Sequence, residues 1–309
     1  MHSIAPYTIR CFDGDLDSKR FKKKNSVLDQ IRGKHDLFQI LSSFVASHES
    51  EYTDFEDKKM VVRFQSTQFD EGARVVHGVL EVGMYGVRTN IINRETGAID
   101  FKKTQQNAEI IPHYFCFYLP IGCDEGIALF ASYRGIGIKT LFNEFFAKYF
   151  TMVTDRRLQM NPLSYDKAIQ DWQEAQTKEI RAIRFTGFQD KADALSALGH
   201  EESDLILRPK KKTFFGKLKD FRTASTEQYK AIEQLVPLCA QVKAVVELDG
   251  RARVFRIGPA SNITICQIEL DEKVKLSGGM PQLDSMHDWV KELLGEFAKT
   301  VYPGKKVSL

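Results

Sequence analysis

The stretch HYFCFYLPIGCDEGIALFASY, residues 113 to 133, decides the fold. It contains two apolar runs, His113 to Leu119 and Gly126 to Tyr133, whose aromatic and aliphatic residues favour β-strands. The residues between the runs include Pro120 and Gly122, which favour a turn. The stretch therefore predicts a central β-hairpin.

Upstream of this hairpin the apolar residues alternate with polar ones, which is typical of half-buried strands. Three such segments follow one another, with glycine-containing turns between them, and they predict an antiparallel meander. They are Lys59 to Phe64, Arg74 to Gly83 and Tyr85 to Ile92. Helical spacing of apolar residues predicts helices on either side, at Val27 to Phe44 and at Lys139 to Phe150.

Downstream, the strongest local signal is Asp249-Gly250, because both residue types tolerate the positive φ angles of a two-residue hairpin turn. It predicts a hairpin of Val242 to Leu248 with Arg251 to Ile257. The other predicted strands are Glu179 to Phe185, Asp204 to Leu207 and Ile263 to Leu270. The predicted helices are Asp190 to Leu198, Thr226 to Val236 and Leu283 to Lys299.

These elements predict an α+β fold in which antiparallel sheets with flanking helices form two lobes. The first lobe covers residues 1–155 and the second covers residues 178–309. Residues 155–162 are polar and irregular, and a helix capped by Ser164 follows them. We therefore place a connecting helix at residues 156–177.

The composition is that of a globular protein, with 43% hydrophobic and 28% charged residues among 309. Five scattered cysteines without CxxC spacing predict reduced thiols, and Cys116 and Cys123 are expected to be buried. No apolar run is long enough for a membrane helix, so we expect a cytoplasmic protein without membrane insertion. A net charge of +3 is too small to indicate nucleic-acid binding by itself.

The cations, however, are unevenly distributed along the chain. The segment LRPKKKTFFGKLK, residues 207 to 219, is called the basic segment below, and Phe214 and Phe215 lie within it. Its cations are Arg208, Lys210, Lys211, Lys212, Lys217 and Lys219. Lysine and arginine clusters bind phosphate backbones, and neighbouring aromatic rings can stack on bases. The alternative is a solvated lysine loop whose two phenylalanines pack into the core.

A second basic cluster near the N-terminus includes Lys22, Lys23 and Lys24. It is either a basic arm that binds nucleic acid or a solvated lead-in to the first helix.

Signals for catalysis and for cofactors are weak. The turn Gly135 to Thr140 resembles a phosphate loop, but Ile138 separates Gly137 from Lys139, and a phosphate loop needs these two residue types to be adjacent. The histidines lack metal-ligand spacing, so we expect no metal and no other cofactor. Acids near lysines, such as Asp204, leave a metal-dependent nuclease as the alternative. A protein without enzymatic activity is favoured.

The run Lys178 to Phe221 resembles the corresponding region of RexA, a protein of lambdoid phage exclusion systems. In both, a strand leads through a small helix to an apolar strand that ends in a proline-lysine basic stretch. The order of elements over residues 27 to 222 is similar too, and small bacterial antiphage defence proteins such as KwaB share the layout.

The resemblance implies a homodimer that binds double-stranded DNA with little sequence preference and acts in phage exclusion or antiviral defence. A second protein of the defence system is a further expected partner. The resemblance assigns a role in this chain only to the cations of the basic segment together with Pro209. The remaining alternative is a protein-protein sensor or regulator of a defence effector.

Overall fold

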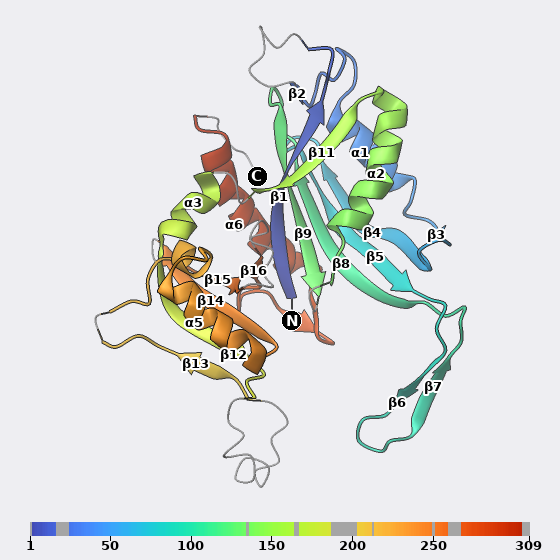
Figure 1. Ribbon diagram of the computed structural model, residues 1–309. Coiled ribbons are helices and arrows are strands. Elements are labelled where there is room, and N and C mark those ends of the chain that lie inside the picture. The colour runs from blue at the N-terminus through green and yellow to red at the C-terminus, as the bar shows by residue number, and fades with distance from the viewer. Residues whose placement is uncertain are drawn as a thin grey trace.

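The computed structural model describes residues 2–16, 25–133, 136–163, 167–186, 203–211, 213–248, 251–258 and 267–304. Helices and strands are both present, as an α+β fold requires, but strands dominate (Figure 1). The described strands form one main sheet of 14 strands and two small two-stranded sheets. Every described pairing in the main sheet is antiparallel.

The elements have the following bounds. The strands of the first half are β1 (His2–Phe12), β2 (Asn25–Ser26), β3 (Thr53–Phe55), β4 (Met60–Asp70), β5 (Val75–Met84), β6 (Thr89–Ile92), β7 (Ile99–Lys103), β8 (Glu109–Tyr118), β9 (Glu125–Tyr133) and β10 (Ile136–Gly137). The later strands are β11 (Arg157–Pro162), β12 (Gln176–Ile183), β13 (Leu205–Leu207), β14 (Gln241–Leu248), β15 (Arg251–Ile257), β16 (Ile268–Glu269), β17 (Leu276–Ser277) and β18 (Met280–Pro281). The helices are α1 (Leu37–Ala46), α2 (Lys139–Thr154), α3 (Lys167–Glu174), α5 (Glu227–Leu235) and α6 (Leu283–Val301), with short 3-10 turns η3 (Leu218–Phe221) and η4 (Val236–Leu238).

The main sheet has the strand order β13-β12-β14-β15-β16-β1-β9-β8-β5-β4-β3. This single sheet runs through both of the lobes that the sequence predicted, because β1 pairs with β9 on one side and with β16 on the other. The division at residues 155 and 178 therefore stays a prediction. What the structure shows is the continuous sheet.

Helices cover both faces of the sheet. Residues of α1 and α2 belong to a core on one face, and residues of α3 and α6 belong to a core on the other. Along β8, Tyr114 and Cys116 join the α6 core, whereas Phe115 and Phe117 join the α2 core. The run in residues 113 to 119 is apolar throughout because both of its faces are buried.

The central hairpin is confirmed as β8 and β9, and the Asp249-Gly250 hairpin is confirmed as β14 and β15, since Leu248 lies opposite Arg251. The predicted helices at 139–150, 226–236 and 283–299 are confirmed as α2, α5 and α6. The predicted helix at 190–198 lies outside the described residues.

Two predictions were wrong in their bounds. The helix predicted from Val27 begins at Leu37, where the Asp36 side chain caps it by accepting a hydrogen bond from the Phe38 backbone N–H. Residues 157–162, which the sequence analysis left irregular, form β11 because they pair with β1. The connecting helix is thus reduced to α3. Of the strand predicted at 263–270, the described part is β16.

Strand β1 lies in the middle of the main sheet, although the sequence analysis assigned no strand there. Pro6 argues against a central strand, because proline lacks the N–H that a ladder needs. The structure accommodates Pro6 because it lies at a gap between two partner strands on one side of β1. On that side β16 pairs as far as Ile4, and β11 begins at Tyr7.

Two stacked imidazoles lie between α6 and the sheet. The rings of His77 on β5 and His287 on α6 have centroids 3.4 Å apart and are nearly parallel. The Tyr114 hydroxyl bonds Nδ1 of His287 at 2.8 Å, whereas the buried Nδ1 of His77 has no hydrogen-bond partner. Burial lowers the pKa of His77 to about 4, and it lowers the pKa of His113 on β8 to about 4 as well. This interface therefore holds neutral histidines.

Cys116 and Cys123 are buried free thiols, as predicted. Burial raises the pKa of Cys116 to about 12, so its reactive thiolate is scarce at neutral pH. We expect both thiols to react slowly with a thiol reagent in the folded protein, and the partly exposed Cys239 to react first. Mass spectrometry of labelled peptides, with and without denaturant, measures this order. Rapid labelling of Cys116 in the native protein would contradict its burial.

Candidate nucleic-acid interface

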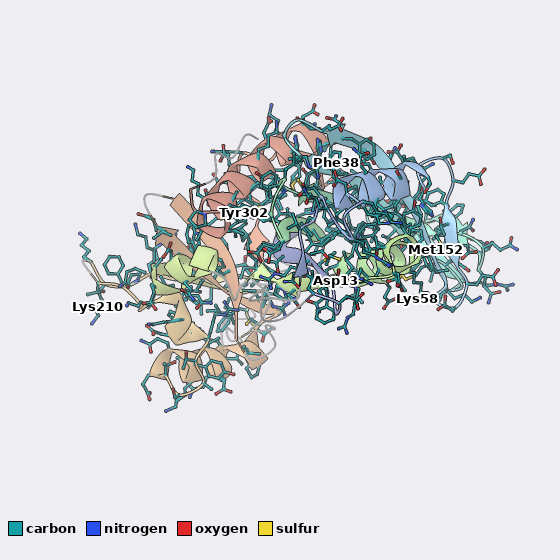
Figure 2. All side chains as sticks on the ribbon, turned by 90° about the horizontal axis from the view of Figure 1, so that it is seen from above. Asp13, Phe38, Lys58, Met152, Lys210 and Tyr302 are labelled. Carbon is teal, nitrogen blue, oxygen red and sulfur yellow. The ribbon has the colours of Figure 1, made fainter. Side chains whose placement is uncertain are left out.

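The basic segment begins at the end of β13, which is the edge strand of the main sheet, and it returns to the fold at η3. Figure 2 shows Lys210 projecting from one end of the molecule, with Lys58 and Met152 toward the opposite end. The basic segment therefore reaches the surface at one end of the molecule.

Backbone hydrogen bonds fix the second half of the segment against β12. The Thr177 N–H donates to the Gly216 carbonyl at 2.8 Å, and the Leu218 N–H donates to Ala175 at 3.1 Å. Gly216 has a φ of 118°, a conformation that favours glycine. Leu218 is fully buried and Phe215 packs against the same core. These contacts hold Lys217 and Lys219 against the main sheet.

The two phenylalanines have different environments. Phe215 packs into the core, as the loop alternative predicted, but Phe214 is 55% exposed. Phe214 is therefore the aromatic ring of this segment that a base or another ligand could reach.

Four cations on this surface share two carboxylates. Glu179 accepts hydrogen bonds from Arg181 and, at 2.8 Å, from Arg208. Glu174 pairs in the same way with two lysines, Lys217 at 2.8 Å and Lys219 at 2.6 Å. Glu179 neutralises only one of its two arginines, so this group keeps a net positive charge. In the Glu174 group, the Asp220 carboxylate also lies beside Lys217, whose N–H donates to it at 2.8 Å, and the two acids balance the two lysines.

These carboxylates stay ionised at neutral pH. Burial alone would raise the pKa of Glu179, but hydrogen bonds from Arg181 and Arg208 outweigh it and hold that pKa below its usual value. Hydrogen bonds from Lys217 and Lys219 lower the pKa of Glu174. The charge pattern is therefore constant across the physiological pH range.

Lys210 and Lys211 are both exposed, and neither makes an ion pair with an acid among the described residues. Lys212 lies outside those residues, as do Lys22, Lys23 and Lys24. The structure thus brings together five of the predicted site residues, and the N-terminal cluster is not placed. The five are Arg208, Lys210, Lys211, Lys217 and Lys219.

The turn that resembles a phosphate loop has another structure where it is described. Ile136 and Gly137 pair with Tyr133 and Ser132 of β9, so these residues form a small strand rather than a loop around a phosphate. The Lys139 ammonium group lies 5.7 Å from the centre of the Tyr7 ring, and burial lowers the pKa of Lys139.

Asp204, named above for the nuclease alternative, and Glu247, another acid close to a lysine, are both engaged in structural contacts. Asp204 accepts a hydrogen bond from the Arg184 backbone N–H at 2.9 Å, and Glu247 pairs with Lys178. Within the described ranges, no three histidine, cysteine or acidic side chains are grouped so that they could hold a metal ion.

No protein-family model matches the chain, and no curated protein matches it. The described helices also contain none that is long and apolar enough to span a membrane.

A cavity of about 750 Å³ lies away from the basic segment, and the sequence analysis missed it. Its walls come from the ends of β1 and α6, from β2 and from the turn between β8 and β9. Its buried carboxylate, Asp13, is held by Arg156 at 2.7 Å and by Ser26 at 3.1 Å. These segments are far apart in sequence, so no local motif could have indicated the cavity.

Proposed function

We propose that the protein binds the phosphate backbone of duplex DNA through the basic segment, with little sequence preference. It does so as a homodimer in a phage exclusion or antiviral defence system. The placement in defence rests on the resemblance of residues 178–221 to RexA, and the binding chemistry rests on the surface just described.

The observation that carries the proposal is the uncompensated charge at the end of the fold. Lys210 and Lys211 project without acidic partners in the described chain, and Lys210 marks the extremity of the molecule in Figure 2. Behind them the Glu179 group, with Arg181 and Arg208, keeps a net positive charge. Cations clustered on one surface bind polyanions by releasing counterions, even where the net charge of the whole protein is small.

The residue types favour binding without sequence readout. Lysine acts on a phosphate as a flexible point charge, and contacts with phosphates carry no direct information about the bases. Arg208 is held by Glu179, and Lys217 and Lys219 are held by Glu174, which leaves Lys210 and Lys211 as the cations of the segment without an acidic partner among the described residues. Exposed Phe214 adds a ring that can stack on unpaired bases at ends or breaks in a duplex.

The carboxylate of Glu174 provides a test by gain of affinity. Glu174→Gln removes the charge that holds Lys217 and Lys219, which frees both lysines for phosphates. We expect tighter duplex binding and a slope of log affinity against log salt that is steeper by about 1. Fluorescence anisotropy with a labelled duplex at several salt concentrations measures both.

The matched control is Glu144→Gln, which breaks an exposed ion pair with Lys58 at the opposite end of the molecule (Figure 2). It changes the net charge by the same amount but should leave affinity and slope nearly unchanged. Equal effects of the two variants would mean that binding follows overall charge rather than the basic segment.

A further inference from the structure

The hairpin of β6 and β7, called the arm below, projects beyond the main sheet (Figure 1). Its two strands pair only with each other in the described structure, and they form a separate small sheet. The register places Ile91 opposite Phe101 and Ile92 opposite Ile99. The arm therefore carries two apolar cross-strand pairs, and the register shifts between them, after Ile91.

These apolar side chains are unusually exposed. Ile91, Ile92, Ile99 and Phe101 are each about half exposed, at 50%, 57%, 49% and 50%, and Val87 at the base of the arm is 62% exposed. An isolated two-stranded hairpin is only marginally stable in water unless something packs on its faces. Several exposed apolar side chains gathered on one projecting element are typical of a protein-protein contact.

Charges on and beside the arm indicate which partner fits. Arg88, Arg94 and Lys102 are exposed on the arm and make no ion pair within the described part of the chain. Together with Lys103 they outnumber the exposed acids of the arm, Glu95 and Asp100. Beside the arm lies a group of acids around edge strand β3, called the acidic rim below. The rim consists of Glu51, Asp54, Glu56 and Asp57, which outnumber Lys58 and Lys59 in the same stretch.

The arm and the acidic rim are neighbours in one chain. The Tyr85 hydroxyl, at the base of the arm, donates to Asp54 at 2.8 Å, and the Tyr85 N–H donates to the Lys59 carbonyl at 3.0 Å. Glu56 and Asp57 lie close enough to help Asp54 raise the pKa of Tyr85 to about 12. The hydrogen bond from Tyr85 to Asp54 is the first cause of that shift.

We propose that the arm docks on the acidic rim of a second copy of this chain. A surface that contains a cationic, apolar projection beside an acidic edge is complementary to itself across a two-fold axis. In such a dimer each arm meets the rim of the other copy, so both contacts form at once. This interface locates the self-association included in the proposed function, and it does not depend on DNA binding.

Charge reversal in the full chain tests the docking. Arg88→Glu/Lys102→Glu makes both arm and rim acidic, and Glu51→Lys/Glu56→Lys makes both basic. In analytical ultracentrifugation each variant alone should dimerise at least about tenfold more weakly than the native protein, because like charges face each other. A mixture of the two variants should dimerise again, since both contacts then join opposite charges.

Two further variants separate docking from folding. Phe101→Ser/Ile92→Ser removes one apolar side chain from each cross-strand pair of the arm and should also yield monomers, with the melting temperature of the main fold retained. Lys299→Glu, an exposed reversal on α6, should leave dimerisation unchanged.

A native protein that is monomeric at every concentration tested would overturn the proposal, as would two folded reversed variants that fail to associate when mixed. Duplex binding is measured on the same samples by its salt slope. If reversal on the arm lowered that slope and left self-association intact, the arm would be a nucleic-acid contact and the dimer interface proposed here would be wrong. Loss of dimerisation with an unchanged slope supports the interface, whether or not the basic segment binds DNA.

Discussion

Replacing Lys210, Lys211 and Lys212 together by alanine is expected to flatten the slope of log affinity against log salt by about 2 to 3. Each lysine that contacts a phosphate releases about one counterion, so the loss should be similar for all duplex sequences. The described members of this triplet are exposed and without acidic partners, so their removal should leave the fold intact. Salt titrations on two unrelated duplexes, together with thermal melting, provide the measurement.

The structure also predicts an order of effects within the basic segment. Lys217→Ala/Lys219→Ala should change the slope less than removal of the triplet, because both lysines already share Glu174. The control is Lys58→Ala, which makes the same change of lysine to alanine at the opposite end of the molecule (Figure 2). A folded triplet variant with an unchanged slope would show that the basic segment is not the DNA site, and the solvated-loop alternative would then hold.

Acid is expected to destabilise the protein strongly between pH 7 and pH 5. His77 and His113 are 4% and 2% exposed, and burial lowers the pKa of each to about 4, against about 6.5 in an unfolded chain. The unfolded state therefore binds more protons in this range, so the stabilisation is full above pH 6.5 and is lost as pH falls toward 4. Each histidine should cost about 2 kcal/mol of unfolding free energy at pH 5 relative to pH 7.

The groups around His77 also favour its neutral form, which agrees with a loss of stability in acid. After burial, the next causes that lower the pKa of His77 are His287 and Lys291 on α6, whereas Asp70 on β4 acts in the opposite direction. Burial is also the first cause that lowers the pKa of His287. Protonation would place charge between two stacked rings, and Nδ1 of His77 has no acceptor in the structure.

Urea unfolding from pH 7.5 to pH 5 measures the dependence, and the variant His77→Gln/His113→Gln should flatten it. Staying above pH 5 keeps most carboxylates ionised, so their titration does not dominate. If the double variant loses stability toward pH 5 as steeply as the native protein, the buried histidines are not the cause.

The sequence by itself determined those elements whose signals are local. The apolar runs at 113–133 and the Asp249-Gly250 turn identified the hairpins β8–β9 and β14–β15, because strand pairing across a short turn needs only neighbouring residues. Helical periodicity likewise identified α2, α5 and α6. The cations of the basic segment were visible as a cluster for the same reason.

The tertiary structure alone decided how distant segments combine. The composition of the segment could not show that Lys217 and Lys219 share Glu174, or that Arg208 shares Glu179 with Arg181. Each acid precedes its partners within the segment by 29 residues or more. The pattern at Tyr85 to Ile92 predicts a half-buried strand of the meander, because Val87 and Ile91 recur at even spacing although both are exposed in the arm.

Strand β1 shows most clearly what local sequence patterns cannot predict. Pro6 makes it an unlikely central strand by any local rule, yet it lies between β9 on one side and the successive partners β16 and β11 on the other. Periodicity reports which face of a strand is buried, but the partner of a strand is chosen by hydrogen bonds and packing with residues more than a hundred positions away. The main sheet, its two buried faces and the surfaces at its ends were therefore decided by the folded chain.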